Sequence, residues 1–336
     1  MVGIESYGVA LPHFRLAASA YVEAWGNCSA RGLKQKAFCS YDEDPVTLGI
    51  EAARQSLDRM PFDIEVSALF FGVTTPPYDE KPSAATLPTA LFNNRAIRVT
   101  EITGSPQAGL QALISAIEFC LTHKGQYALA VAADAPVGKV DSGFEHSLGA
   151  AAAAFIVGSQ GMVAVYKDSI SLTRETFGSR FRRHGEGTLT DLELRTRDNL
   201  VVLQDLGGLL SIKKVDKVRR LALGTETSLG RRAGKILGFP KAEIDALWCM
   251  IGDAGAASAP LALAAALDKA RVGEEILSAG IGAGTTAAWF AAGSQLSKRR
   301  RKGSKVADLI VGGELVDYIT YLKHRRVLSS KPREGS

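Results

Sequence analysis

Two short polar stretches carry side chains that could do chemistry. Ser105, in Gly-Ser-Pro, and Asp253, in Gly-Asp-Ala-Gly, each stand just ahead of a long run of small residues with helical composition. Backbone N–H groups at the start of a helix favour negative charge. A hydroxyl or carboxylate placed there can therefore act as a nucleophile, an acid or a base.

The same residue types are also preferred helix starts. Ser105 followed by Pro106 suits the N-cap and first helical positions, and Asp253 suits an N-cap. A serine nucleophile needs an adjacent base, and no candidate is near in the sequence. We predict helix capping for Ser105 and Asp253, and the alternative makes Asp253 or Glu226 a buried acid or base.

The strand, turn and helix around these stretches occur twice in the chain. Strands at 67–75 and 219–227 precede the two small-residue helices, and a glycine and another strand follow each helix. This long period indicates duplication of a whole α/β half. Because such folds place sites at strand ends and helix starts, both helix starts should face one cleft. The candidate substrate-binding residues there are Gly252, Asp253, Gly282, Gly284 and Glu226.

The predicted organisation has four parts. Residues 1–172 form a first half, 173–214 a polar helical or loop insertion, 215–326 a second half, and 327–336 a disordered tail. The strands expected in the second half include 245–251 and 307–319. Another strand, 162–172, is expected at or near the end of the first half.

Composition narrows the class of protein. The 336 residues are 46% hydrophobic and 22% charged with 34 glycines, which is typical of a soluble α/β protein. The net charge of +5 is concentrated in 297–305 and from Lys323 onward. Because no aromatic or nucleic-acid motif accompanies it, a solvated basic loop is favoured over nucleic-acid binding, with an acidic partner or a phosphate second. No apolar run has membrane-spanning length.

Cysteine and histidine spacing predicts neither a metal site nor disulfides. The four cysteines show no CxxC pattern, so a reducing cytoplasm is expected. Cys120 and Cys249 fall in apolar segments and should be core thiols. Three histidines lie in turns or polar loops and should have surface roles: His13, His146 and His184.

Several segments resemble 3-hydroxy-3-methylglutaryl-CoA synthases, particularly the short archaeal and bacterial form within the thiolase superfamily. The similar segments are 7–16, 42–57, 76–87, 131–158, 235–245, 252–284 and 316–325. The resemblance implies an α/β, thiolase-like fold in which two duplicated βαβαβαββ halves form a five-layered α-β-α-β-α sandwich. It also implies an acyl-CoA condensing enzyme that uses a Cys, a Glu, a His and an Asn.

All four of those positions are replaced in this chain. The cysteine should fall at Ser105 or Pro106, the glutamate at Thr74, the histidine near Leu223 and the asparagine at Asp253. The resemblance therefore predicts a pseudoenzyme, which serves as a non-catalytic or channelling subunit of an acyltransferase/thiolase complex. The implied partners are a second thiolase-fold chain in a homo- or heterodimer, a thiolase and a zinc-binding OB-fold subunit.

Two alternatives remain open. One is an active acyl-CoA acyltransferase with a non-standard group: Ser105, Cys120, or Asp253 with Glu226. The other is a non-catalytic acyl-CoA binder. In each case acyl-CoA or coenzyme A is the expected ligand, with no bound cofactor, metal, nucleic acid or membrane.

Overall fold

A computed structural model describes residues 1–175, 180–191, 205, 207–208, 217–225 and 227–328. Its centre is a ten-stranded sheet with two halves of identical strand order. The first half has the order β5-β4-β6-β7-β1, and the second has β10-β9-β11-β12-β8. The strands are β1 (Gly3–Ala10), β4 (Val66–Gly72), β5 (Arg98–Ile102), β6 (Tyr127–Asp134), β7 (Ala151–Gly158), β8 (Ala164–Thr173), β9 (Val218–Leu223), β10 (Glu243–Asp245), β11 (Glu275–Gly282) and β12 (Gly284–Ala292).

Within the described residues, the two halves of the sheet are paired where β1 meets β8, through the pairs Gly3–Val165 and Ile4–Ala164. Strand β8 pairs with β12 along nearly its whole length. Because of this pairing, β8 belongs to the second half of the sheet. The sequence had predicted this strand at or near the end of the first half. The predicted residue bounds of the halves stay a prediction.

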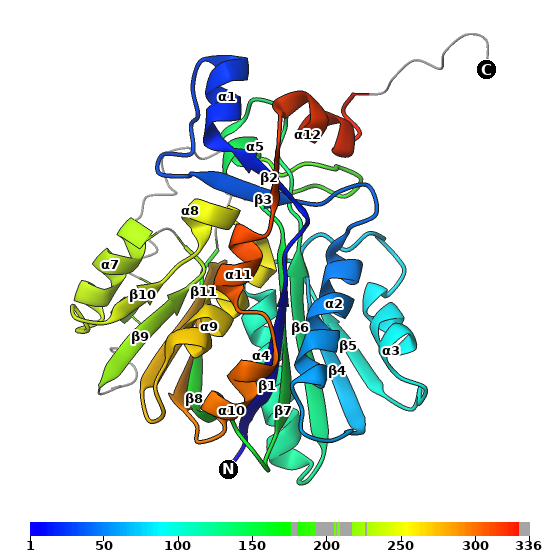
Figure 1. Cartoon of the computed structure of the whole chain (residues 1–336), viewed down its shortest axis with the longest axis vertical. Helices are drawn as coiled ribbons and strands as arrows, with labels where there is room; N and C mark the ends of the chain where they lie inside the picture. The colour runs from blue at the N-terminus through cyan, green and yellow to red at the C-terminus, as the bar shows by residue number, and fades with distance from the viewer. Residues whose placement is uncertain (176–179, 192–204, 206, 209–216, 226, 329–336) are drawn as a thin grey trace.

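Helices lie between and outside the two halves of the sheet (Figure 1). Helices α4 (Ala108–Thr122) and α9 (Ser258–Lys269) contact strands of both halves and form the middle layer with them. Helices α2 (Pro45–Asp58) and α3 (Thr86–Leu91) lie outside the first half, and α7 (Thr227–Ile236) lies outside the second. This arrangement confirms the predicted five-layered, thiolase-like fold.

The starts of the two central helices touch each other. A Cβ atom at Gly109, in the first turn of α4, would clash with the backbone carbonyl oxygen of Ala256 just ahead of α9. Only glycine lets two backbones approach this closely. The prediction that both helix starts face the meeting place of the halves is therefore confirmed.

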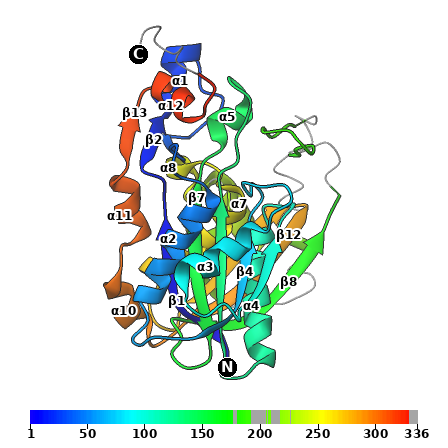
Figure 2. The ribbon, with the colours of Figure 1, turned by 90° about the vertical axis from the view of Figure 1, so that its right-hand side faces the viewer.

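A smaller sheet covers one end of the molecule (Figure 2). It has the order β13-β2-β3, with β2 (Phe14–Ala17), β3 (Gln35–Phe38) and β13 (Glu314–Val316). Helices α1 (Ala18–Trp25), α5 (Gly143–Ser147) and α12 (Tyr318–His324) lie beside it. The remaining elements among the described residues are α8 (Trp248–Ile251), α10 (Leu296–Arg299), α11 (Val306–Val311) and the 3₁₀ turns η1 (Ser83–Ala85), η2 (Gly255–Ala257) and η3 (Arg300–Lys302).

Two strand predictions were wrong in part. Strand β10 ends at Asp245, and the apolar residues after it form the short helix α8, so Cys249 is not in a strand. The stretch 307–319, predicted as a strand, divides into most of α11, β13 and the start of α12. Short apolar runs fit either element, and here tertiary packing decides between them.

The basic segment 297–305 is not simply a solvated loop. Arg299 is buried, and its guanidinium donates to the backbone carbonyl of Glu5 at 3.0 Å. Arg300 donates to the carbonyls of Asp268 and Ala270, each at 3.0 Å, at the C-terminal end of α9. Cations at this end of a helix satisfy its last carbonyls. Part of the positive charge thus has a structural role.

Candidate functional site

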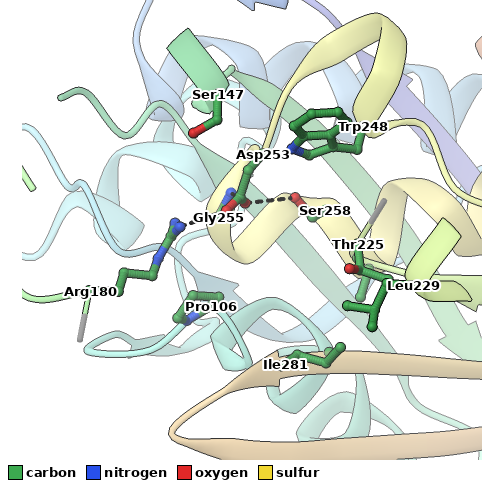
Figure 3. A pocket seen from close by; sticks show the side chains of 13 residues that line it. Pro106, Ser147, Arg180, Thr225, Leu229, Trp248, Asp253, Gly255, Ser258 and Ile281 are labelled. Carbon is green, nitrogen blue, oxygen red and sulfur yellow. Dashed lines mark hydrogen bonds and ion pairs between the residues drawn. The ribbon is translucent and has the colours of Figure 1, made fainter. Parts of the chain in front are cut away.

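The cleft lies where the starts of α4 and α9 meet (Figure 3). It has a volume of about 270 Å³. Pro106, ahead of α4, lines one side, and Gly255, Ser258 and Ala259 line the side next to α9. The remaining lining residues are Ser147, Arg180, Gly224, Thr225, Leu229, Trp248, Asp253, Gly280 and Ile281.

An ion pair spans this cleft. The Asp253 Oδ2 atom lies 2.6 Å from Nη1 of Arg180, and the two side chains are only 24% and 12% exposed. The Oδ1 atom accepts the N–H of Gly255 at 2.9 Å and the hydroxyl of Ser258 at 3.3 Å. Asp253 thus satisfies an N–H group ahead of α9, as a cap does, and also holds a guanidinium in the cleft (Figure 3).

Arg180 was not predicted from the sequence as a site residue. It lies in a polar stretch without clear periodicity, and its partner is 73 residues away in the chain. Its backbone φ of +46° is uncommon for a residue with a side chain. A second arginine of the same stretch, Arg182, donates to the carbonyl oxygen of Thr74 at 3.0 Å. The described part of this stretch therefore places one cation in the cleft and a second against the carbonyl of Thr74.

Ser105 lies beside the glycine-rich turn of the second half. Its Oγ atom accepts the N–H of Gln107 at 3.3 Å and that of Ala283 at 3.4 Å. Helix α4 begins at Ala108 and its N-cap residue is Gln107. Ser105 is therefore not the N-cap that the sequence predicted, because it lies two residues further from the helix. A Cβ atom at Gly282 would clash with this Oγ, which explains the glycine. The hydrogen bonds found for Ser105 Oγ in the described part of the chain come from backbone N–H groups.

Thr74 contacts a carboxylate that the sequence analysis did not single out. Its hydroxyl donates to Oδ2 of Asp134 at 2.5 Å, and Oδ2 also accepts the N–H of Ala256 at 2.8 Å. The N–H of Thr75 donates to Oδ1 at 2.9 Å, and the Thr75 hydroxyl donates to it too. Burial raises the pKa of Asp134, while the hydrogen bonds from Thr74, Thr75 and Ala256 oppose that shift. Asp134 therefore ties the end of β6 to both halves.

The remaining positions that the sequence predicted for the site place no acidic or basic side chain in the cleft, as far as the described residues show. Leu223 is buried at the end of β9 in an apolar cluster. Gly252 and Gly284 have φ values of +84° and +99°, a conformation that favours glycine, and neither lines the cleft. Glu226 lies outside the described residues. No group of three or more metal-ligating side chains occurs among the residues described.

Cys120 is a core thiol, as predicted. It is 2% exposed near the end of α4, and burial raises its pKa to about 11. Because the thiolate is the reactive form, we expect iodoacetamide to modify Cys120 at least about 100-fold more slowly in the folded protein than in urea. Peptide mass spectrometry over a time course measures both rates. Equal rates would show that the helix end is open to solvent.

His146 contradicts the predicted surface role. It is 1% exposed and lies against the ring of Tyr21, with centroids 4.1 Å apart. Its Nδ1 atom is 2.9 Å from the hydroxyl oxygen of Ser29 and 3.1 Å from the Ser29 N–H nitrogen. His13 and His184 are exposed, as predicted. Nothing in the spacing of residues 29 and 146 indicates their contact.

Burial of His146 predicts a loss of stability in mild acid. Burial lowers its pKa below the ordinary 6.5, against the opposite effects of Glu145 and Asp141. The unfolded chain then binds this proton more readily, so the free energy of unfolding should fall as pH drops below about 6.5. Urea unfolding at pH 7.5 and 5.5 measures the loss. It should be smaller for His146→Gln, and an equal loss in both proteins would contradict the assignment.

Comparison with known proteins agrees with this architecture. No family model matches the chain. It is 31% identical to a hydroxymethylglutaryl-CoA synthase of Pyrococcus furiosus over 97% of its length and 96% of the relative. It is 28% identical to one of Caldivirga maquilingensis, over 97% and 98% of the two chains.

Solved structures show the same fold. One described as MvaS in complex with 3-hydroxy-3-methylglutaryl coenzyme A has a TM-score of 0.84 at 19% identity, covering 99% of this chain and 93% of that one. An HMG-CoA synthase complexed with CoA has a TM-score of 0.80 at 16% identity, covering 96% and 89%. The long match to the Pyrococcus protein, together with the duplicated fold and central cleft, shows that this chain belongs to the hydroxymethylglutaryl-CoA synthase family.

Proposed function

We propose that the cleft binds an acyl-CoA thioester and that the chain is an acyltransferase of hydroxymethylglutaryl-CoA synthase type with a serine in place of the usual thiol. The observation that carries this proposal is the setting of Ser105, whose Oγ accepts two backbone N–H groups beside the cleft. The relatives that match nearly the full length of this chain are named as synthases, which supports an enzyme over a non-catalytic protein.

A route for coenzyme A leads outward from the cleft. A neighbouring cavity of about 530 Å³, which we call the outer cavity, shares Ser147 and Trp248 with the cleft. Arg31 and Lys139 also line it. Its size suits an extended ligand, and the two cations suit the phosphates of coenzyme A. The solved relatives described as complexes with CoA and with HMG-CoA support this choice of ligand.

Ser105 is the proposed acyl acceptor. Its oxygen would attack the thioester carbonyl carbon, the C–S bond would break, and the serine proton would pass to the departing thiolate of coenzyme A. The N–H groups of Gln107 and Ala283 favour negative charge on the attacking oxygen. Arg180 and Asp253 line the cleft as a paired cation and anion. The cation would polarise a thioester carbonyl, and the anion would keep the guanidinium in position.

Turnover tests this function. Wild-type protein supplied with acetyl-CoA and acetoacetyl-CoA should release free coenzyme A, measured by thiol titration, and Ser105→Ala should lose most of that release. Ser297→Ala, which removes an exposed serine on α10, is the matched control and should keep it. Equal rates in all three proteins would remove Ser105 from the mechanism.

A second candidate is a non-catalytic subunit of an acyltransferase/thiolase complex. The replacement of the family's thiol position and the lack of a side-chain base bonded to Ser105 among the described residues favour it. The edge strand β5 would carry a homo- or heterodimer contact, and the partners would be a thiolase and a zinc-binding OB-fold chain. Co-purification of such chains from the native host, with no turnover by the isolated protein, would support this candidate over the first.

We propose that the protein is located in the cytoplasm. All four cysteines are free thiols, which suits the cytoplasm. Within the described chain, no helix combines the length and apolar character needed to cross a membrane.

A further inference from the structure

Three side chains that the proposed function does not use lie together beside the outer cavity. They are Ser29, in the loop after α1, His146, on α5, and Asp141, just ahead of α5. The Ser29 hydroxyl oxygen is 2.9 Å from Nδ1 of His146. On the other side of the imidazole ring, Nε2 of His146 is 3.5 Å from Oδ1 of Asp141.

The hydrogen bonds fix the direction of proton transfer in this group. The backbone N–H of Ser29 points at Nδ1 of His146 from 3.1 Å, and a backbone N–H can only donate. Nδ1 must therefore hold a lone pair, and the ring proton lies on Nε2, toward Asp141. A neutral imidazole in this tautomer can accept the hydroxyl proton of Ser29.

His146 is held in place on its remaining sides. It is 1% exposed and packs on the Tyr21 ring, and its pKa is lowered by burial, which keeps it neutral near pH 7. Its buried Nε2 makes no hydrogen bond among the described residues, and Oδ1 of Asp141 lies 3.5 Å from it. Such contacts are often long before a substrate binds.

The backbone of Asp141 is locally strained. Its backbone φ is +55°, which is uncommon for a residue with a side chain, and its N–H donates to Oε2 of Glu145 at 2.6 Å. Strain of this kind occurs at functional sites, where neighbouring contacts hold the backbone. Here it places the carboxylate opposite the histidine.

Ser29 is open to a substrate. It is exposed and lines the outer cavity of about 530 Å³. Arg31 and Lys139 line the same cavity, and their positive charge favours the oxyanion that forms when a carbonyl is attacked. The buried base, the exposed hydroxyl and the cationic wall together meet the requirements of nucleophilic catalysis.

We propose that Ser29, His146 and Asp141 form a second catalytic site, which hydrolyses carboxylic esters through an acyl-Ser29 intermediate. Ser29 Oγ bonds to the carbonyl carbon while its proton moves to Nδ1 of His146. The bond to the alcohol breaks, and that leaving group takes the proton from Nδ1. Water then attacks the acyl group and gives one proton back through His146 to Ser29, so an acid and an alcohol are released.

This site does not rest on the proposed function. Arg31 and Lys139 of the outer cavity serve both proposals, but the three residues of this site are distinct from the cleft residues Ser105, Asp253 and Arg180, and its test uses no coenzyme A. Loss of one activity therefore leaves the other to be judged separately.

The test uses the full chain and two probes. Diisopropyl fluorophosphate should label Ser29, located by peptide mass spectrometry. p-Nitrophenyl acetate should be hydrolysed at a rate that Ser29→Ala lowers by at least about 100-fold and Asp141→Asn lowers by about 10-fold. Ser297→Ala, an exposed serine far along the chain, should behave like wild type.

Ser29→Ala removes one exposed hydroxyl, so its folding is checked by an unchanged melting temperature. His146→Gln tests the base separately, because it should abolish labelling of Ser29 while leaving Ser29 in place. Absence of label on Ser29 in the wild-type protein, or an unchanged hydrolysis rate in Ser29→Ala, would overturn the proposal and leave the Ser29–His146 contact as a structural tie.

Discussion

Ser105→Cys should accept the acetyl group of acetyl-CoA about 100-fold faster than the wild-type protein, because a thiolate is a far stronger nucleophile than a serine hydroxyl. The N–H groups of Gln107 and Ala283 that face the Ser105 oxygen would equally stabilise a sulfur anion. Release of free coenzyme A in the first turnover, followed by rapid mixing and mass spectrometry, measures both rates.

The matched control places a cysteine away from the cleft. Ser297→Cys puts an exposed thiol on α10, outside the cleft, and should accept acetyl groups no faster than wild type. If Ser105→Cys reacted no faster than Ser297→Cys, the turn between Gly104 and Gln107 would not activate a nucleophile. The acyl-acceptor role of position 105 would then be wrong.

Asp134→Ala should lower the free energy of unfolding by about 3 to 5 kcal/mol, because it leaves one buried and several half-buried donors without their acceptor. The N–H groups of Thr75 and Ala256 and the hydroxyls of Thr74 and Thr75 all donate to this carboxylate. Three of these groups belong to the turn after β4, and the fourth belongs to η2, just ahead of α9. Removing their shared acceptor should loosen the contact between the halves.

Urea unfolding followed by circular dichroism measures this effect. Asp58→Ala, an exposed carboxylate at the end of α2, is the control and should leave stability unchanged within error. If both variants lost a similar amount of unfolding free energy, Asp134 would contribute no more to stability than an exposed carboxylate does. The bridging role assigned to it would then fail.

Much of the fold could be predicted from the sequence because local pattern and duplication agree. The small residues of 108–122 and 258–269 allow close packing, and Gly109 shows how close that packing is. Where local pattern is ambiguous, prediction fails: Trp248 to Ile251 has strand-like residues but forms a helical turn.

The site was less predictable because its contacts join distant parts of the chain. Asp253 and Ser105 could be singled out from their place ahead of helices. Arg180 could not, because a polar stretch without periodicity gives no sign of which side chain turns inward. His146 was misplaced for a related reason: its environment is built by Tyr21 and Ser29, more than a hundred residues earlier.

Acyl transfer to position 105 is most directly tested by incubating the wild-type protein with isotope-labelled acetyl-CoA, quenching in acid and mapping the label by peptide mass spectrometry. We predict one acetyl group per chain, located on Ser105 and absent from Ser105→Ala. A protein that binds acetyl-CoA but carries no label at Ser105 would contradict the acyltransferase account and favour the non-catalytic subunit.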